Sequence, residues 1–225
     1  MLVSYIVFPG SNCDHDIEHA YSNVIKTDVK RVWHRDTDIG SPDLVVLPGG
    51  FSYGDYLRCG ALAKLSPIMK SVVEFANGGG PVLGICNGFQ ILCEVGLLPG
   101  VLLQNTKMKF LSRFEHYKVE SSNTPFTKSF SKGEVVRTPV AHFEGNYYID
   151  SAGLERIQGN DQVVFRYCNE NGERTGALNG AVDDIAGVCN SERNVLGMMP
   201  HPERVCDESV AGVGTLSAIE LLNVA

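Results

Sequence analysis

The stretch VLGICNGFQIL, residues 82–92, joins a short apolar run to a segment with helical character and places Cys86 at the junction. A short, nearly continuous apolar run is typical of a strand buried on both faces of a parallel sheet. Gly84 and Gly88 stand two positions to either side of the cysteine, where a sharp strand-to-helix turn requires small residues. We therefore predict that a strand ends and a helix begins at Cys86.

The first half of the chain repeats this alternation of strand and helix. Apolar runs at residues 2–10 and 44–50 each end in a Pro-Gly turn, and residues 17–25 and 61–76 carry helical patterns between the runs. Alternating strands and helices predict an α/β fold: a doubly wound, mostly parallel, flavodoxin-like sheet with helices on both faces.

The second half is less regular. Asn-Gly turns separate the apolar runs 165–168 and 185–189, which indicates some antiparallel structure. A last strand is expected at residues 195–200 and a last helix at 208–224. Because no linker or internal repeat interrupts the chain, we expect residues 1–225 to form a single domain.

Composition excludes several classes of protein. The 26 acidic and 19 basic residues give a net charge of −7, and without a cluster of Lys and Arg we expect no nucleic-acid partner. Seven cysteines without CxxC spacing indicate reduced thiols. The N-terminus reads as a strand instead of a signal peptide, and no apolar run is long enough to span a membrane. These features predict a cytoplasmic protein without a membrane partner.

The position of Cys86 favours a nucleophile. A strand-to-helix turn projects its corner residue, the helix N-terminus favours thiolate over thiol, and the backbone N–H of Asn87 would point toward an oxyanion. Gln90 lies on the same helical face as Cys86. The alternative is a buried structural cysteine, which is what we expect of the other six. Those six are Cys13, Cys59, Cys93, Cys168, Cys189 and Cys206.

A thiol nucleophile needs a base, and His201 is the best candidate among six histidines. Prolines flank it, and the residue before a proline is held extended, so His201 and Glu203 would lie side by side. The carboxylate would then orient the imidazole. A rigid turn with a surface ion pair is the alternative. His15 and His19 are read as a solvated helix face, and we expect no metal site.

Oxyanion donors are expected after a different strand. The segment LPGG, residues 47–50, supplies two glycines, Gly49 and Gly50, whose backbone amides can approach a ligand closely. A tight structural turn is the alternative reading of these residues alone.

Together, the motifs LPGG (47–50), GICNGFQ (84–90) and HPE (201–203) resemble those of the class I glutamine amidotransferases. More narrowly, the chain resembles the glutaminase subunits of phosphoribosylformylglycinamidine synthases, through motifs that span nearly its whole length. These include FPGSNCD, PGGFSYGDYLRCGA, VAHFEGNYY, IAGVCN and NVLGMMPHPER. Ala181 departs from the serine that relatives tend to carry after Asn-Gly.

The resemblance implies a role for each matching residue. Cys86 would be the nucleophile, His201 the general base and acid, and Glu203 the orienting carboxylate. The backbone amides of Gly50 and Asn87 would form the oxyanion hole. The residues expected to help hold substrate glutamine are Gly49, Gln90, His142 and Glu144.

The implied reaction is hydrolysis of glutamine to glutamate and ammonia through a glutamyl thioester, with no cofactor in this chain. The ammonia would pass to a large synthetase subunit, which would hold ATP and magnesium and aminate formylglycinamide ribonucleotide in purine biosynthesis. A small accessory subunit would complete the complex.

Two other functions remain open from the sequence. One is a different cysteine hydrolase on the same fold, such as a peptidase or γ-glutamyl hydrolase. The other is a non-catalytic regulatory or redox-sensing subunit in which Cys86 is a reactive thiol without turnover. A sensor has no need of the complete Cys-His-Glu set, and PGG with Gln90 fits free glutamine better than a peptide.

Overall fold

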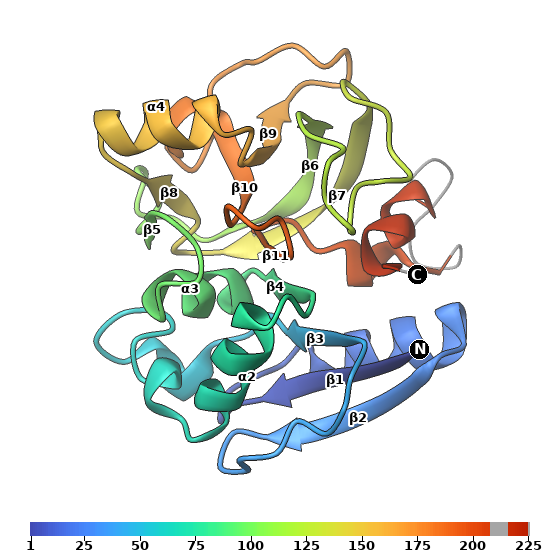
Figure 1. Ribbon diagram of the computed structural model, residues 1–225. Coiled ribbons are helices and arrows are strands. Elements are labelled where there is room, and N and C mark those ends of the chain that lie inside the picture. Colours follow the sequence, from blue (N-terminus) through green and yellow to red (C-terminus); the bar gives the residue numbers. More distant parts are fainter. Residues whose placement is uncertain (208–215, 225) are drawn as a thin grey trace.

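A nine-stranded sheet runs through the molecule in the order β2-β1-β3-β4-β11-β10-β9-β6-β7, and β5 and β8 form a separate two-stranded sheet (Figure 1). The computed structural model describes residues 1–207 and 216–224. The strands are β1 (Leu2–Val7), β2 (Asp28–Trp33), β3 (Leu44–Leu47), β4 (Val82–Ile85), β5 (Val101–Leu103), β6 (Leu111–Val119), β7 (Val135–His142), β8 (Asn146–Tyr148), β9 (Val163–Cys168), β10 (Ile185–Cys189) and β11 (Val195–Met198).

The sheet has a parallel and an antiparallel half. The pairs β1–β2, β1–β3, β3–β4 and β4–β11 are parallel, and β3 and β4 are buried at every residue. The pairs β10–β11, β10–β9, β9–β6 and β6–β7 are antiparallel. The prediction of an α/β sheet with antiparallel structure in the second half is confirmed.

Helices cover the parallel half. Figure 1 shows α2 and α3 on the near side of strands β1 to β4 and the helical segment after β1 on the far side. The helices are α1 (Asp14–Glu18), α2 (Ile68–Asn77), α3 (Asn87–Glu94) and α4 (Ser151–Gly159), with a π-helical segment η1 (His19–Ile25) and short 3₁₀ segments η2 (Ser52–Asp55), η3 (Ala63–Leu65), η4 (Val182–Asp184), η5 (Pro202–Val205) and η6 (Leu216–Leu222).

Several predicted boundaries are wrong in detail. The helix expected at 61–76 begins only at Ile68, because Pro67 belongs at a helix start, where its missing N–H is not needed. The helix expected at 17–25 is a short α1 continued by the π-helical η1. Of the helix expected at 208–224, residues 208–215 lie outside the described residues, and Leu216–Leu222 is a 3₁₀ segment.

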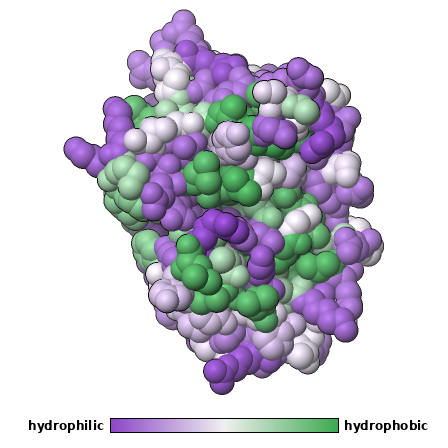
Figure 2. Space-filling model, turned by 90° about the vertical axis from the view of Figure 1, so that its left-hand side faces the viewer, coloured by the Kyte–Doolittle hydropathy of each residue, from purple (hydrophilic) through white to green (hydrophobic). Residues whose placement is uncertain are grey.

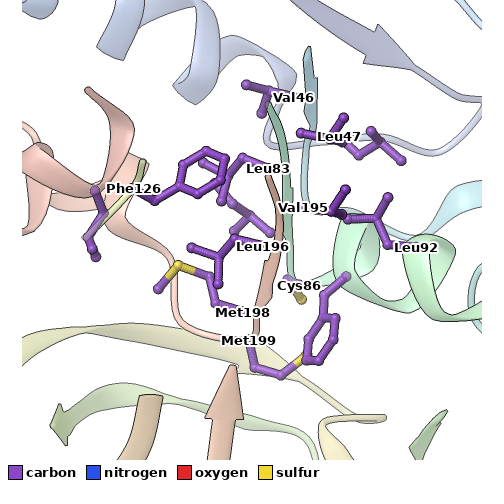
Figure 3. Packing of buried hydrophobic residues seen from close by; sticks show 14 of the residues in the cluster. Val46, Leu47, Leu83, Cys86, Leu92, Phe126, Val195, Leu196, Met198 and Met199 are labelled. Carbon is purple, nitrogen blue, oxygen red and sulfur yellow. The ribbon is translucent and has the colours of Figure 1, made fainter. Parts of the chain in front are cut away.

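Glycines seat α3 closely on the sheet. A Cβ at Gly88 would lie 1.9 Å from the Leu47 carbonyl oxygen of β3, and one at Gly84 would lie 2.5 Å from Leu92 Cδ1. Figure 3 shows Leu47 and Leu92 on the side of the strands that faces this helix, with Cys86 at the end of β4. The core therefore fixes where α3 begins, and with it the position of the cysteine.

In the part of the chain that the structure describes, no helix combines the length and the apolar character that crossing a membrane requires.

Candidate active site

Three neighbouring parallel strands deliver the predicted residues to one edge of the sheet. Gly49 and Gly50 follow β3, Cys86 follows β4, and His201 comes three residues after the end of β11. The β4–β11 pairing continues past the strands, since the Cys86 N–H donates to the Met198 carbonyl at 2.8 Å. The carboxyl ends of parallel strands are where α/β sheets bind ligands, so this edge is the candidate site.

Cys86 occupies a strained turn. Its backbone has φ 51° and ψ −104°, a conformation outside the regions that side-chain-bearing residues prefer, and it caps the N-terminus of α3. The residue is 4% exposed, and its thiol donates to the Ala141 carbonyl on β7 at 3.7 Å. This is the elbow that the glycine spacing predicts, although its corner is buried instead of projecting into solvent.

The pKa of the Cys86 thiol lies well above its ordinary value. Burial is the largest cause, and the nearby Cys13 and Glu203 add to it. Arg204 and a hydrogen bond from the Asn87 backbone N–H act in the opposite direction on this pKa. The helix N-terminus therefore favours the thiolate, as expected, but loss of hydration has the larger effect on this pKa.

His201 and Glu203 form a buried pair. His201 Nδ1 lies 2.6 Å from Glu203 Oε1, and both side chains are almost fully buried. The contact does not use extended chain as expected: Pro202 starts the 3₁₀ segment η5, which turns Glu203 back toward the ring. His201 Nε2 has no hydrogen-bond partner among the described residues. That nitrogen is thus available to a thiol or a leaving group.

Gly49 packs against both the imidazole of His201 and the Cys86 turn. A Cβ there would stand 2.8 Å from His201 Cε1 and 3.5 Å from Cys86 Cβ, so only glycine fits. Gly50 follows with φ 149°, pairs with Ser11 in an isolated bridge and lies on the cavity beside His201. The structure thus brings Gly49, Gly50, Cys86 and His201 together.

Gln90 and Glu144 belong to a hydrogen-bond network beside the elbow. The Asn87 side chain accepts from the Ser52 N–H and donates to Gln90 Oε1, and Gln90 Nε2 donates to the Glu144 carbonyl at 2.7 Å. Glu144 Oε2 accepts from the Cys59 N–H at 3.3 Å. In this arrangement Gln90 and Glu144 tie the loops around the cysteine to one another.

His142 lies on the other face of the β6–β7 hairpin. Side chains alternate along a strand, so Ala141 faces the cavity beside His201 while His142 faces a separate cavity of about 310 Å³ with Tyr167. His142 is buried, its Nδ1 lacks a partner, and burial, with the neighbouring His201, lowers its pKa to about 4. His142 thus lines a different cavity from His201, while the carbonyl of its neighbour Ala141 accepts from the Cys86 thiol.

Cys13 is a neighbour that the sequence interpretation missed, having been read as a core cysteine. A Cβ at Gly49 would lie 3.0 Å from its Sγ, and Arg204 Nη2 donates to that Sγ at 2.8 Å. Burial, with the charge of Glu203, raises the pKa of Cys13 to about 12. Its place shortly after the first strand, at the same edge of the sheet as Cys86, is the signal that was available.

Cys13, His201 and Glu203 also have possible metal-ligand atoms within 4.8 Å of one another. A cation here would meet the Arg204 guanidinium on Cys13 Sγ, and Glu203 already holds the imidazole. Like-charge repulsion and the protonated thiol both disfavour a metal at this position.

A cavity of about 230 Å³ opens at this edge of the sheet. Its described lining comes from the turns after β1, β3 and β11 and from one face of the β6–β7 hairpin. These residues are Asn12, Cys13, Gly50, Phe51, Phe110, Ser112, Ala141, His201 and Arg204. The cavity can admit a small molecule to the imidazole, beside the Cys86 turn.

Residues 2–213 match the family described as CobB/CobQ-like glutamine amidotransferase domain. The phosphoribosylformylglycinamidine synthase subunit PurQ of Moorella thermoacetica is 54% identical over 214 residues, covering 94% of this chain and 90% of the relative. The same subunit of Sulfurimonas denitrificans is 48% identical over 223 residues, covering 99% and 97%.

Two solved structures are also similar to this chain. A chain in the structure of PurLQS from Thermotoga maritima is 40% identical, with a TM-score of 0.86 and coverage of 99% of this chain and 96% of that one. The glutaminase domain of Trypanosoma brucei CTPS with bound acivicin is 13% identical, with a TM-score of 0.59 and coverage of 98% and 93%. At that identity the likeness shows the fold alone.

Proposed function

The chain belongs to the family of CobB/CobQ-like glutamine amidotransferase domains, and from that premise we propose that it is the glutaminase subunit of a phosphoribosylformylglycinamidine synthase. It hydrolyses glutamine to glutamate and ammonia for a synthetase subunit that converts formylglycinamide ribonucleotide to formylglycinamidine ribonucleotide. The single observation that carries the chemistry is the buried His201–Glu203 pair, with a free Nε2, beside the strained Cys86 turn.

The first half of the reaction forms a thioester. His201 Nε2 takes the Cys86 proton as Sγ attacks the side-chain amide carbon of glutamine, and Glu203 stabilises the imidazolium through Nδ1. The backbone N–H groups of Gly50 and Asn87 stabilise the oxyanion. When the C–N bond breaks, His201 returns the proton to the departing nitrogen, which leaves as ammonia.

The second half releases glutamate. His201 takes a proton from water, the resulting hydroxide attacks the thioester carbon, and the C–S bond breaks. The sulfur leaves as thiolate and recovers the proton from His201. Burial raises the pKa of the resting thiol, so the reaction depends on His201 to take its proton.

The subunits of the proposed complex are inferred from the same relatives. They are named as subunits of a synthase, and the T. maritima structure is titled PurLQS, which supports a synthetase partner. Within this proposal, a small accessory subunit joins the complex, ATP and magnesium bind to the synthetase subunit, and this chain itself carries no cofactor.

The surface suits such a partner. Figure 2 shows apolar side chains gathered in the middle of one face of the molecule. Large apolar side chains are well exposed in the described chain, among them Tyr56, Leu57 and Leu65 at 71%, 77% and 73%. Exposed apolar surface of this kind is typical of subunit interfaces.

The test uses the assembled synthase with two nitrogen sources. Cys86→Ser is expected to abolish glutamine-dependent formation of the amidine product and to leave ammonium-dependent formation intact. Cys93→Ser, on the same helix with its thiol directed at the Pro99 carbonyl, is the matched control and is expected to keep both activities. Glutamine-dependent activity in the Cys86→Ser complex would refute the proposal.

Substrate choice separates the remaining alternatives. A peptidase or γ-glutamyl hydrolase would release products from peptides or γ-glutamyl chains, and a redox sensor would release none. We expect ammonia from free glutamine and no cleavage of peptides.

A further inference from the structure

We propose that Arg204 determines the preference for glutamine by binding its α-carboxylate in the cavity beside the triad. The inference rests on the proposed glutaminase function and deepens it, since that function assigns no cationic group to the α-carboxylate of the substrate.

The first observation is the charge of the cavity. None of the described residues that line it carries a carboxylate, and among them Arg204 is the only one with a permanent positive charge. Free glutamine presents a negative α-carboxylate at the end opposite its amide. A lining with one fixed cation and no anion matches that end of the molecule.

The second observation is the state of the guanidinium. Arg204 is partly buried, with 30% of its side chain exposed, and the structure gives that side chain one hydrogen bond, to the Cys13 thiol. Asp16 lies 3.7 Å from Nε, beyond a good hydrogen bond. A guanidinium has five N–H donors in a planar fork, so donors remain for a bidentate carboxylate.

The third observation is the position of Arg204 relative to the reacting groups. Cys13 Sγ is hydrogen-bonded to Arg204, and a Cβ at Gly49 would lie 3.0 Å from that Sγ, 2.8 Å from His201 Cε1 and 3.5 Å from Cys86 Cβ. In extended glutamine the amide carbon and the carboxylate carbon are roughly 5 Å apart. Arg204 and His201 line one cavity, so a single glutamine can reach both.

The experiment compares two substrates in the assembled synthase: glutamine and 4-aminobutanamide, which is glutamine without its α-carboxylate. For Arg204→Met we expect kcat/KM with glutamine to fall about 10- to 100-fold, the range for losing a hydrogen bond to a charged group. The loss should appear mainly in KM. With 4-aminobutanamide, kcat/KM should change less than threefold, so the preference for glutamine nearly disappears.

Arg31→Met is the matched control, because Arg31 also faces an aspartate of α1, Asp14 at 3.4 Å, but does not line the cavity. It should leave both values unchanged. Arg204→Lys is the control for a folding defect, because it keeps the positive charge and loses the planar fork of the guanidinium. It should lower kcat/KM by about tenfold with glutamine alone.

The outcomes are distinct. An equal loss with both substrates would overturn the proposal and make Arg204 a positioning residue for Cys13 or the His201–Glu203 pair. An unchanged preference would overturn it as well, while leaving the glutaminase function in place. A wild-type complex that releases no glutamate from glutamine would refute the proposed function itself.

Discussion

The turns after β1 and β4 both place a cysteine at the start of a helix, yet they build different chemistry. Cys13 caps α1 with φ −99° and ψ 9°, whereas Cys86 caps α3 with φ 51° and ψ −104°. Both thiols are buried, both border Gly49, and the pKa of each is raised. Cys13 receives a hydrogen bond from Arg204, while Cys86 donates one to Ala141.

This difference shows that closeness to a histidine does not by itself make a nucleophile. Cys13 Sγ lies within 4.8 Å of possible ligand atoms of His201 and Glu203, and it already accepts a hydrogen bond from the Arg204 guanidinium. Only Cys86 combines the strained turn, the Asn87 N–H and a helix seated by glycines on the sheet. Under the proposed function, it is the backbone around the thiol that distinguishes Cys86 as the nucleophile.

Removing the charge of Glu203 should have the largest effect. Glu203→Gln is expected to slow glutaminase turnover about 10³- to 10⁴-fold, because the amide no longer stabilises the imidazolium that forms when Cys86 reacts. Steady-state turnover of the assembled synthase measures it, with thermal unfolding as the control for folding. A normal turnover number would mean that His201 works without an orienting carboxylate.

The rate of alkylation reports the ionisation of both thiols, Cys13 and Cys86, in one experiment. The rate follows the thiolate fraction, and a raised pKa leaves both thiols protonated at neutral pH. At pH 8, iodoacetamide should therefore label Cys13 about 10³-fold more slowly than a thiol of ordinary pKa, near 8.5. Labelling of both should keep rising about tenfold per pH unit toward pH 10.

Peptide mapping distinguishes the two cysteines, and the urea-unfolded chain provides the unshifted reference. A labelling rate at Cys86 that levels off near pH 7 would show a thiolate in the resting site and contradict the dominance of burial.

The close packing of α3 on the sheet distinguishes the turn at Cys86 from the turn after β1. Gly88→Ala places a Cβ against the Leu47 carbonyl oxygen, a fixed backbone atom, and should lower the free energy of unfolding by about 3 kcal/mol or more. Gly159→Ala, at the end of α4 with no atom within 4 Å of the new Cβ, should change it by less than about 1 kcal/mol. Urea unfolding compares the two, and equal stabilities would mean that the elbow tolerates a shifted helix.

Replacing Cys13 should have the smallest effect. Cys13→Ala removes a neighbour of the reactive pair without removing a participant, so glutaminase kcat is expected to stay within about tenfold of wild type. A loss as severe as that of Cys86→Ser would break the comparison and bring Cys13 into the chemistry.

The parallel half of the fold was largely predictable from the sequence. Apolar runs ending in Pro-Gly identify β1 and β3, and the glycines around Cys86 identify the elbow, because buried strands and tight turns tolerate few other residues. The edge strand β2 was missed, since its side chains are mostly polar or partly exposed. The His201–Glu203 contact was foreseen, but not the 3₁₀ turn that makes it.

What the sequence could not predict depends on tertiary contacts. Whether His142 or Ala141 faces the cavity is a matter of strand register, which a one-residue shift reverses. The place of Cys13 beside Gly49 depends on how the turn after β1 packs against the one after β3, through the Ser11–Gly50 bridge. Neither is encoded in local spacing.

The hydrogen bond from the Cys86 thiol to the Ala141 carbonyl has a consequence for the lifetime of the protein. Oxidants such as peroxides attack exposed thiolates, whereas this sulfur is almost fully buried and its pKa is raised by that burial. The Cys86 thiol is therefore held in the form that resists oxidative damage best.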